Sequence, residues 1–305
     1  MKKVIIIILI VIAMFALVKS RKPAATPVNK IVEPVPAQQE NMTQNVQAFS
    51  VSGSSEDGNN KWEVKGESAD IFSDVVNIRS IEAKSEGKET CLQLTADEGV
   101  FHKESKNVEL SKNVVANTDE GTTFKTDTLK WLAKDEKITT DDRVDIQREN
   151  MHLSGTGVES IPSMKKVNLK QDVKMVVDGF TGMVFQDGKK PSGEKSFPTV
   201  ITCDGPLEVD YENNVSYFNK NVVIEDSQGK ISADVVIAYF NPEQKGIYKV
   251  VAKGNVKITS GENTSQSDEA VYLVNEGRAI LTGRPKLCIF STGKLLEDKK
   301  AQESL

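Results

Sequence analysis

The sequence predicts an all-β protein: an elongated, open β-jelly roll built from strand repeats of about 30 residues, preceded by a single N-terminal transmembrane helix. Three observations predict this fold class. A short phrase, a polar residue or glycine followed by Val-x-apolar, recurs at a nearly constant interval. Stretches of alternating apolar and polar residues, the period of a half-buried strand, follow residue 49. The sustained helical candidate is an unbroken apolar run close to the first residue.

The apolar run covers residues 4–18 and has basic residues on both sides. A helix of this length measures about 22 Å, and flanking lysines can snorkel to cover the rest of a hydrocarbon core of about 30 Å. A cleaved signal peptide is the alternative, because its apolar region has the same length. No small-x-small cleavage site follows directly, so we expect an uncleaved anchor at residues 1–21. The flanking charges leave its orientation open.

Changes in composition divide the rest of the chain into further segments. Prolines stiffen the stretch after the anchor, as in a tether that holds a folded unit away from a membrane. A second break is dense in Gly, Lys and Pro. The expected segments are a Pro-rich tether at 22–48, a first β domain at 49–178, a linker at 179–199, a second β domain at 200–293 and a polar tail at 294–305.

The recurring phrase reads KNVVA at residues 112–116, DRVDI at 142–146, QDVKM at 171–175, KNVVI at 220–224, GNVKI at 254–258 and, in degenerate form, GRPKL at 283–287. Its lead positions Val114, Val144, Val173, Val222, Val256 and Pro285 are 30, 29, 49, 34 and 29 residues apart. Such a period indicates one supersecondary unit, stacked repeatedly so that neighbours bury its apolar face.

A second phrase keeps the same interval and ends in an aspartate, at Asp70, Asp97, Asp127, Asp204, Asp234 and Asp268. Aspartate can hydrogen-bond its own backbone and tolerates tight turns, so we expect these residues at turns where strands begin or end. A catalytic role is not expected, because an active site needs one special constellation rather than one carboxylate per repeat.

Alternating apolar residues in both β domains are expected to line the inside of the folded sheet. If the lining stays open as a groove, it can hold a lipid, since each buried methylene contributes about 0.8 kcal/mol and a twelve-carbon chain about 10 kcal/mol. If it closes, the same residues form an ordinary core. The best candidates for lipid contact are Phe124, Leu129, Ile146, Met175, Ile224, Ile237 and Ile258.

Composition argues against most catalytic and cofactor-binding classes. The net charge of −5 without a basic stripe argues against nucleic acid, and two histidines make a clustered metal site improbable. The sequence GKKPSGEKS at residues 188–196 lacks the adjacent Gly-Lys of a nucleotide loop. We therefore expect no enzyme and no cofactor. Cys91 and Cys288 lie in strand-like stretches, where we expect them to be buried.

Residues 95–159 resemble the LptC type of lipopolysaccharide-export protein. They share a strand with a small residue before Asp, the Val-x-Leu-x-x-x-Val pair at Val108, Leu110 and Val114, and a closing Gly-x-Gly at Gly155 and Gly157. The anchor and Pro-rich tether fit that type as well. Residues 201–240 and 254–273 resemble the OstA repeat of the soluble periplasmic LptA type. The second array extends the chain past a single LptC-like unit.

The resemblance implies a non-catalytic bridge protein of the cell envelope. It implies a single-pass inner-membrane protein with a cytoplasmic N-terminus and most of the chain in the periplasm. It also implies that the chain accepts lipopolysaccharide from an inner-membrane ABC transporter complex and passes it toward the outer membrane through an apolar β-groove. The implied partners are lipopolysaccharide, the transporter and either an LptA-like periplasmic protein or another copy joined by strand-edge pairing.

Two further functions remain open from the residues alone. One is a membrane-anchored envelope scaffold with a closed β-repeat core and no lipid cargo. The other, a β-solenoid polysaccharide lyase or esterase, requires an asymmetric cluster of acid, base and cationic residues that the sequence does not show. In the bridge hypothesis, sheet edges near residues 62–72 and 281–290 are expected to pair with partners, because an open repeat sheet ends in unpaired backbone groups.

We expect the apolar run to stay on the mature protein, because no small-x-small signal follows it. Alkaline carbonate extraction of membranes should leave the chain in the pellet, and N-terminal sequencing should begin ahead of the run. A mature N-terminus at Ala24 or Ala25 would instead identify the run as a signal peptide.

Overall fold

The computed structural model describes residues 44–54, 61–86, 91–119, 121–161, 166–178, 198–210, 212–227, 229–241, 246–276 and 278–290. The expected anchor and polar tail lie outside these ranges, as do most of the expected tether and nearly all of the expected linker. Within the ranges, no helix has the length and apolar character needed to cross a membrane.

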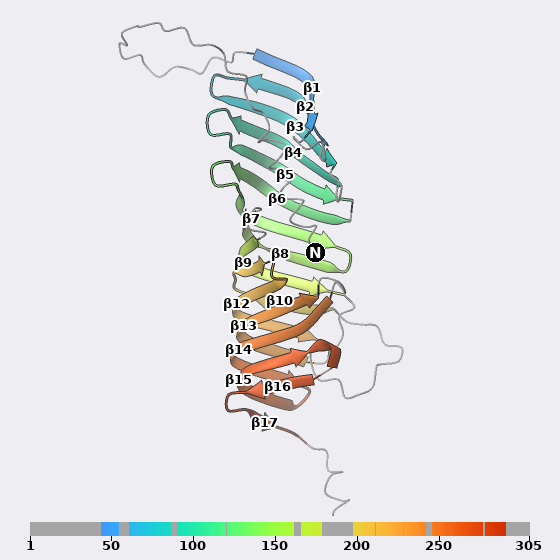
Figure 1. Cartoon of the computed structure of the whole chain (residues 1–305), viewed down its shortest axis with the longest axis vertical. Coiled ribbons are helices and arrows are strands. Elements are labelled where there is room, and N and C mark those ends of the chain that lie inside the picture. Colours follow the sequence, from blue (N-terminus) through green and yellow to red (C-terminus); the bar gives the residue numbers. More distant parts are fainter. Residues whose placement is uncertain are drawn as a thin grey trace, which may run out of the picture. The chain divides into compact units, whose positions relative to one another are not determined.

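The described chain is built from β-strands, with one short 3-10 turn, η2, at Val274–Glu276, so the all-β prediction is confirmed (Figure 1). The strands are β1 (Gln44–Ser54), β2 (Lys61–Ile71), β3 (Val75–Glu86), β4 (Cys91–His102), β5 (Val108–Thr118), β6 (Thr122–Leu132), β7 (Lys137–Arg148), β8 (Met151–Ile161), β9 (Lys166–Val177), β10 (Thr199–Cys203), β11 (Leu207–Asp210), β12 (Val215–Asp226), β13 (Gly229–Asn241), β14 (Gly246–Ser260), β15 (Asn263–Leu273), β16 (Arg278–Thr282) and β17 (Lys286–Cys288).

The chain forms two compact units: unit 1 contains residues 1–149 and 154–169, and unit 2 contains residues 150–153 and 170–305. In unit 1, strands β1 to β7 each pair antiparallel with the next strand in the chain. In unit 2, β10 pairs with β9 and β12, β11 pairs with β12, and β12 to β15 pair in chain order. Strands β16 and β17 both pair with β15.

Each long strand folds over, so that its two halves enclose one core. In β5, Val108 and Leu110 are buried before the middle of the strand, and Val114 and Ala116 after it. All four belong to the same core cluster, although they lie on both halves of one strand. Each such strand therefore runs through both leaves of the folded sheet, where a leaf is the part of the sheet on one side of the bend.

The fold line is a β-bulge that coincides with the recurring phrase. Between β5 and β6 the pairing shifts by one residue, because Lys112 and Asn113 lie opposite Asp127 alone. Lys112 and Asn113 both have positive φ, which turns the strand sharply. The next residue, Val114, points into the core and is fully buried. The lead valines of the phrase are therefore the residues that fill the inside of the bend.

Four aspartates of the second phrase also lie at this bend and not at turns, contrary to the sequence-based expectation. Asp204 follows the end of β10 and Asp70 lies next to the end of β2, as expected. Asp97, Asp127, Asp234 and Asp268 lie in the middle of their strands. None of these four aspartates has positive φ. Asp97 and Asp234 instead accept hydrogen bonds from Asn113 and Asn255, which are left-handed bulge residues further along the chain. The period was correct, and the assignment of the phrase to turns was wrong at these four positions.

Two further expectations are wrong in unit 1 and at the end of unit 2. Residues 62–72 do not form a sheet edge, because β1 pairs along almost the whole length of β2. Strand β1 begins at Gln44, inside the expected tether.

Cys91 and Cys288 are exposed, contrary to expectation, since each lies at the end of its strand, whereas Cys203 is buried. Burial raises the pKa of the Cys203 thiol.

The bend predicts a matched pair of stabilities in unit 1. Val114→Ala should lower the free energy of unfolding by about 2 kcal/mol, because the side chain is fully buried. Val51→Ala, the same truncation at a residue that is 51% exposed, should change it by about 0.5 kcal/mol or less. Both tryptophans, Trp62 and Trp131, lie in unit 1, so urea titration followed by their fluorescence measures this unit. Equal losses for the two variants would contradict the placement of the bend.

Candidate functional site

An apolar row crosses every strand of unit 1 from β1 to β7 on the inner face of one leaf. Its members are direct cross-strand partners, each opposite the next, so their side chains lie on the same side of the sheet. In order they are Val51, Val64, Ala83, Leu94, Ala116, Phe124 and Ile146. Phe124 and Ile146, both expected to contact lipid, are therefore the half-buried end of a continuous track.

A second row crosses unit 2 in the same manner. Met175 of β9 is the partner of Ile201, which faces Ile224 of β12. The row continues through Ile231 to Ile258 of β14. Three of the expected lipid contacts, Met175, Ile224 and Ile258, therefore lie on one line of side chains. Ile201 was not among the residues expected to contact lipid, although alternation with Cys203 in the stretch VITC marks it as inward.

Leu129 lies on the opposite leaf of unit 1. It is buried and pairs with Leu110, which lies before the bulge of β5, whereas Phe124 pairs with Ala116 after it. Because both leaves contribute to one core cluster, Leu129 and the Phe124 row enclose the same interior.

Ile237 is on the other face of its strand from the core. Its neighbours Val236 and Ala238 are buried, while Ile237 is half-buried and pairs with Tyr217 and Val251. The cause is the bulge around Asp234, where the pairing of β13 with β12 shifts by one residue. A one-residue shift exchanges the two faces of a strand, so alternation counted from Ile231 selects the wrong side chain beyond the bulge. Val236 occupies the inward position.

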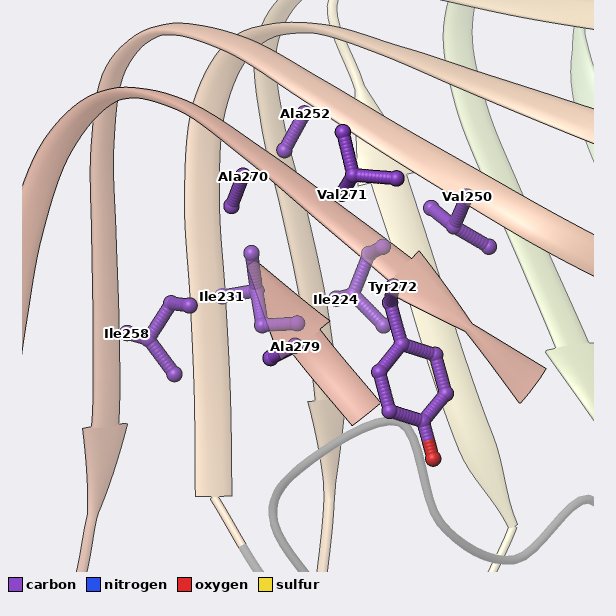
Figure 2. Close-up of a pocket in the computed structure, with 9 residues that line it drawn as sticks. All are labelled: Ile224, Ile231, Val250, Ala252, Ile258, Ala270, Val271, Tyr272 and Ala279. Atoms are coloured by element: carbon purple, nitrogen blue, oxygen red, sulfur yellow. The ribbon is translucent and has the colours of Figure 1, made fainter. Parts of the chain in front are cut away.

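The inside of unit 2 contains a small apolar cavity at the bend (Figure 2). Ile224, Ile231 and Ile258 surround it from three strands, and Figure 2 shows the hydroxyl of Tyr272 pointing away from these aliphatic side chains. Burial, followed by the nearby Asp226, raises the pKa of Tyr272, so the lining carries no charge at neutral pH. The cavity measures about 20 Å³, roughly the space of one water molecule. The two leaves are therefore in contact here.

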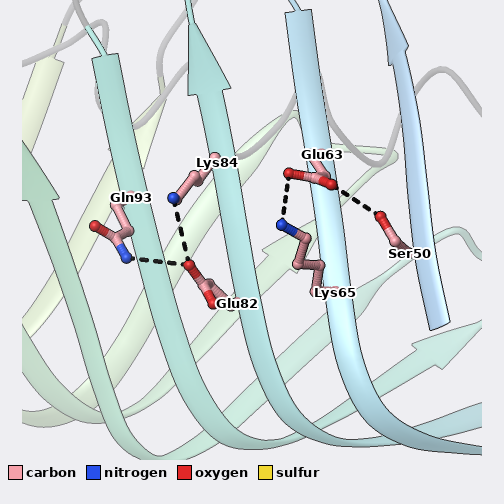
Figure 3. Close-up of polar contacts among 6 residues, drawn as sticks. All are labelled: Ser50, Glu63, Lys65, Glu82, Lys84 and Gln93. Carbon is pink, nitrogen blue, oxygen red and sulfur yellow. Dashed lines mark hydrogen bonds and ion pairs between the residues drawn. The ribbon is translucent and has the colours of Figure 1, made fainter. Parts of the chain in front are cut away.

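The outer face of unit 1 is charged where the inner face is apolar. In Figure 3, Glu63 accepts hydrogen bonds from Ser50, at 2.9 Å, and from Lys65, at 3.0 Å. These hydrogen bonds lower the pKa of Glu63, and the bond from Lys65 has the larger effect. On the neighbouring strands, Glu82 lies 3.6 Å from Lys84 and accepts a hydrogen bond from Gln93 at 3.3 Å. Such exposed pairs contribute little stability, but they keep this face in water and leave the inside as the apolar surface.

Among the described residues, no group of three or more His, Cys, Asp or Glu side chains has the arrangement of a metal site. The described strands instead place apolar side chains together on their inner faces.

The family comparisons agree with this geometry. Residues 4–178 match the family model described as lipopolysaccharide-assembly, LptC-related. The chain belongs to this LptC-related family. Residues 204–297 match a second model, described as the LptA/(LptD N-terminal domain) lipopolysaccharide transport protein. A search of curated protein sequences gives no match. This LptC-related chain thus carries a C-terminal LptA-like extension, and the two matched segments are those that the resemblance in the sequence indicated.

The reversed parity beyond Asp234 can be tested with two adjacent substitutions. Val236→Asp should destabilise unit 2 by about 3 kcal/mol or more, because it buries a carboxylate among apolar side chains. Ile237→Asp should cost far less, since the half-buried side chain can turn its carboxylate toward water. Thermal unfolding followed by circular dichroism, together with protease resistance of β12 to β15, measures both variants. A larger loss of stability in Ile237→Asp than in Val236→Asp would show that Ile237 points inward, as the sequence alternation predicts.

Proposed function

We propose that this chain is a non-catalytic bridge component of lipopolysaccharide transport, anchored in the inner membrane with its β units in the periplasm. It accepts lipopolysaccharide from an inner-membrane ABC transporter complex and passes it toward the outer membrane. The observation that carries the proposal is the pair of apolar rows, each crossing successive strands of its unit on the inner face. Membership of the LptC-related family supports the same role.

The acyl chains of the cargo lie along the rows, in contact with Phe124, Leu129 and Ile146 in unit 1 and with Met175, Ile224 and Ile258 in unit 2. Burying a twelve-carbon chain contributes about 10 kcal/mol, which is enough to offset separation of two leaves held mainly by apolar contacts. The cavity of about 20 Å³ is far too small for such a chain. Cargo therefore enters by parting the leaves. Ile237, which points outward, takes no part.

The free edges suit the partners that the transport role requires. Val51 belongs to the inner row of unit 1 yet is 51% exposed, so the row is accessible from water at β1. This edge would face the transporter. At β17, Leu287, Ile289 and Phe290 are between 60% and 66% exposed beside a strand paired on one side, to β15. An LptA-like protein or another copy would add its strand there. Partner subunits supply the energy of transport.

A membrane-anchored scaffold with a closed core is the second candidate. The small size of the apolar cavity favours it, since the leaves are in contact without any cargo. In this reading the inner rows stabilise the fold alone, and no lipid enters.

Photo-crosslinking in cells distinguishes the two functions. A crosslinking amino acid at Ile146 and at Met175, both half-buried on the inner rows, should give lipopolysaccharide adducts on the full-length chain. The same probe at the exposed neighbours Gln147 and Lys174 should give none, because their side chains point to the other face. Adducts at all four positions would show nonspecific contact. An absence of adducts at Ile146 and Met175 would favour the closed scaffold.

A further inference from the structure

A ladder of side-chain hydrogen bonds runs along the outside of the bend. In each rung, an aspartate side chain accepts from the second of two consecutive residues with positive φ further along the chain. Asn113 donates to Asp97 at 2.6 Å, Asn221 to Asp204 at 2.6 Å and Asn255 to Asp234 at 2.9 Å. Arg284 approaches Asp268 in the same position, at 3.4 and 3.5 Å. At these four places the two recurring phrases of the sequence are the two halves of one contact.

The donors occupy backbone conformations that need support. Each is the second of two consecutive residues with positive φ: Lys112 and Asn113, Lys220 and Asn221, Gly254 and Asn255, and Gly283 and Arg284. Left-handed backbone is unfavourable for residues other than glycine, and asparagine is among those that tolerate it best. At Gly254, an added Cβ would lie 2.3 Å from an oxygen of Asp234, so the aspartate covers the bulge directly. The aspartate therefore holds the bulge in its bent form.

The bulges are the pivots between the two leaves. In β14, Val250 and Ala252 lie before the bulge and Ile258 after it, and all three line the apolar cavity of unit 2. Ile231 precedes Asp234 in β13, while Ala270 follows Asp268 in β15, and both line the same cavity. A change of angle at these bulges would move apart the side chains that line the cavity (Figure 2).

We propose that the Asp–Asn ladder sets the separation of the two leaves and so positions the apolar rows for the cargo. Asp97, Asp204 and Asp234, with their asparagine donors, are positioning residues, since they lie on the outside of the bend and act through the bulge. The role of the ladder in positioning cargo rests on the proposed transport function, whereas its control of the distance between the leaves does not. The hydrogen bonds of the ladder hold the two leaves together and resist their separation when an acyl chain enters or leaves.

The distance between the leaves can be measured directly on the full-length chain. Spin labels at Lys230 and Glu208, exposed residues on opposite sides of the bulges in unit 2, report the separation. Cys91 and Cys288 are replaced by serine, whereas buried Cys203 can stay. The variants are Asp234→Ala, which removes the acceptor, and Asn255→Gly, which removes the donor while keeping the left-handed backbone.

Asp234→Ala and Asn255→Gly should both broaden the distance distribution toward larger separations. Asp234→Asn, which retains an amide oxygen as acceptor, should restore the narrow distribution. Glu276→Ala, which removes an exposed partner of Arg278 away from the labels and the bulges, serves as the control and should leave it narrow. An unchanged distribution in folded Asp234→Ala would overturn the proposal, as would equal broadening in Glu276→Ala.

Exchange of a fluorescent fatty acid provides the functional readout. Loss of one rung should accelerate exchange by roughly five- to tenfold, the effect of one hydrogen bond to a charged acceptor reduced by its exposure. Broadened distances with unchanged exchange would overturn the link to cargo. Failure of the unsubstituted chain to bind the probe would count against the proposed transport function, while the distance measurement would still decide the role of the ladder.

Discussion

An antiparallel strand with one apolar face cannot shield that face from water by itself, and the rest of this structure depends on how that problem is solved. Each long strand bends in the middle, so that its two halves place their apolar side chains against each other. The bend is made by a β-bulge, and the bulge contains residues with left-handed backbone. The space on the inner side of the bend is filled by one valine side chain. Val114, Val222 and Val256 are these valines, and all three are almost completely buried.

This solution also creates a continuous apolar surface on the inside of the sheet. Pairing in register places one apolar residue per strand on a common line. Each added repeat therefore lengthens the row by the apolar residue that it contributes. The charged outer face keeps the same sheet in water, as Glu63 and Glu82 show with their lysine partners. Because both leaves contribute to one core, most of the row in unit 1 is shielded from water.

Sequence patterns predicted the strands, the repeat period and both family resemblances, because alternation and periodicity are local properties. They did not predict the side chains beyond a bulge. The extra residue of the bulge lies in β12, where Lys220 and Asn221 lie opposite Asp234 alone. In β13 the buried positions change across Asp234 from Ile231 and Ala233 to Val236 and Ala238. Alternation continued from Ile231 therefore assigned Ile237 inward instead of Val236. Strand β1 escaped notice for another reason: QNVQAFSVSGS is mostly polar and follows a Pro-rich stretch, and its pairing with β2 supplies the order that its composition does not.

The exposed apolar edge at β17 has a consequence for the cell that makes this chain. Leu287, Ile289 and Phe290 border backbone groups that a second strand can pair with, which is the combination that drives uncontrolled association of sheet edges. Copies whose β17 edge is uncovered are therefore prone to associate with one another, and this association increases with their concentration. The cell is best served by producing this chain in no excess over the protein that covers the edge, which places a limit on its abundance as well as on its structure.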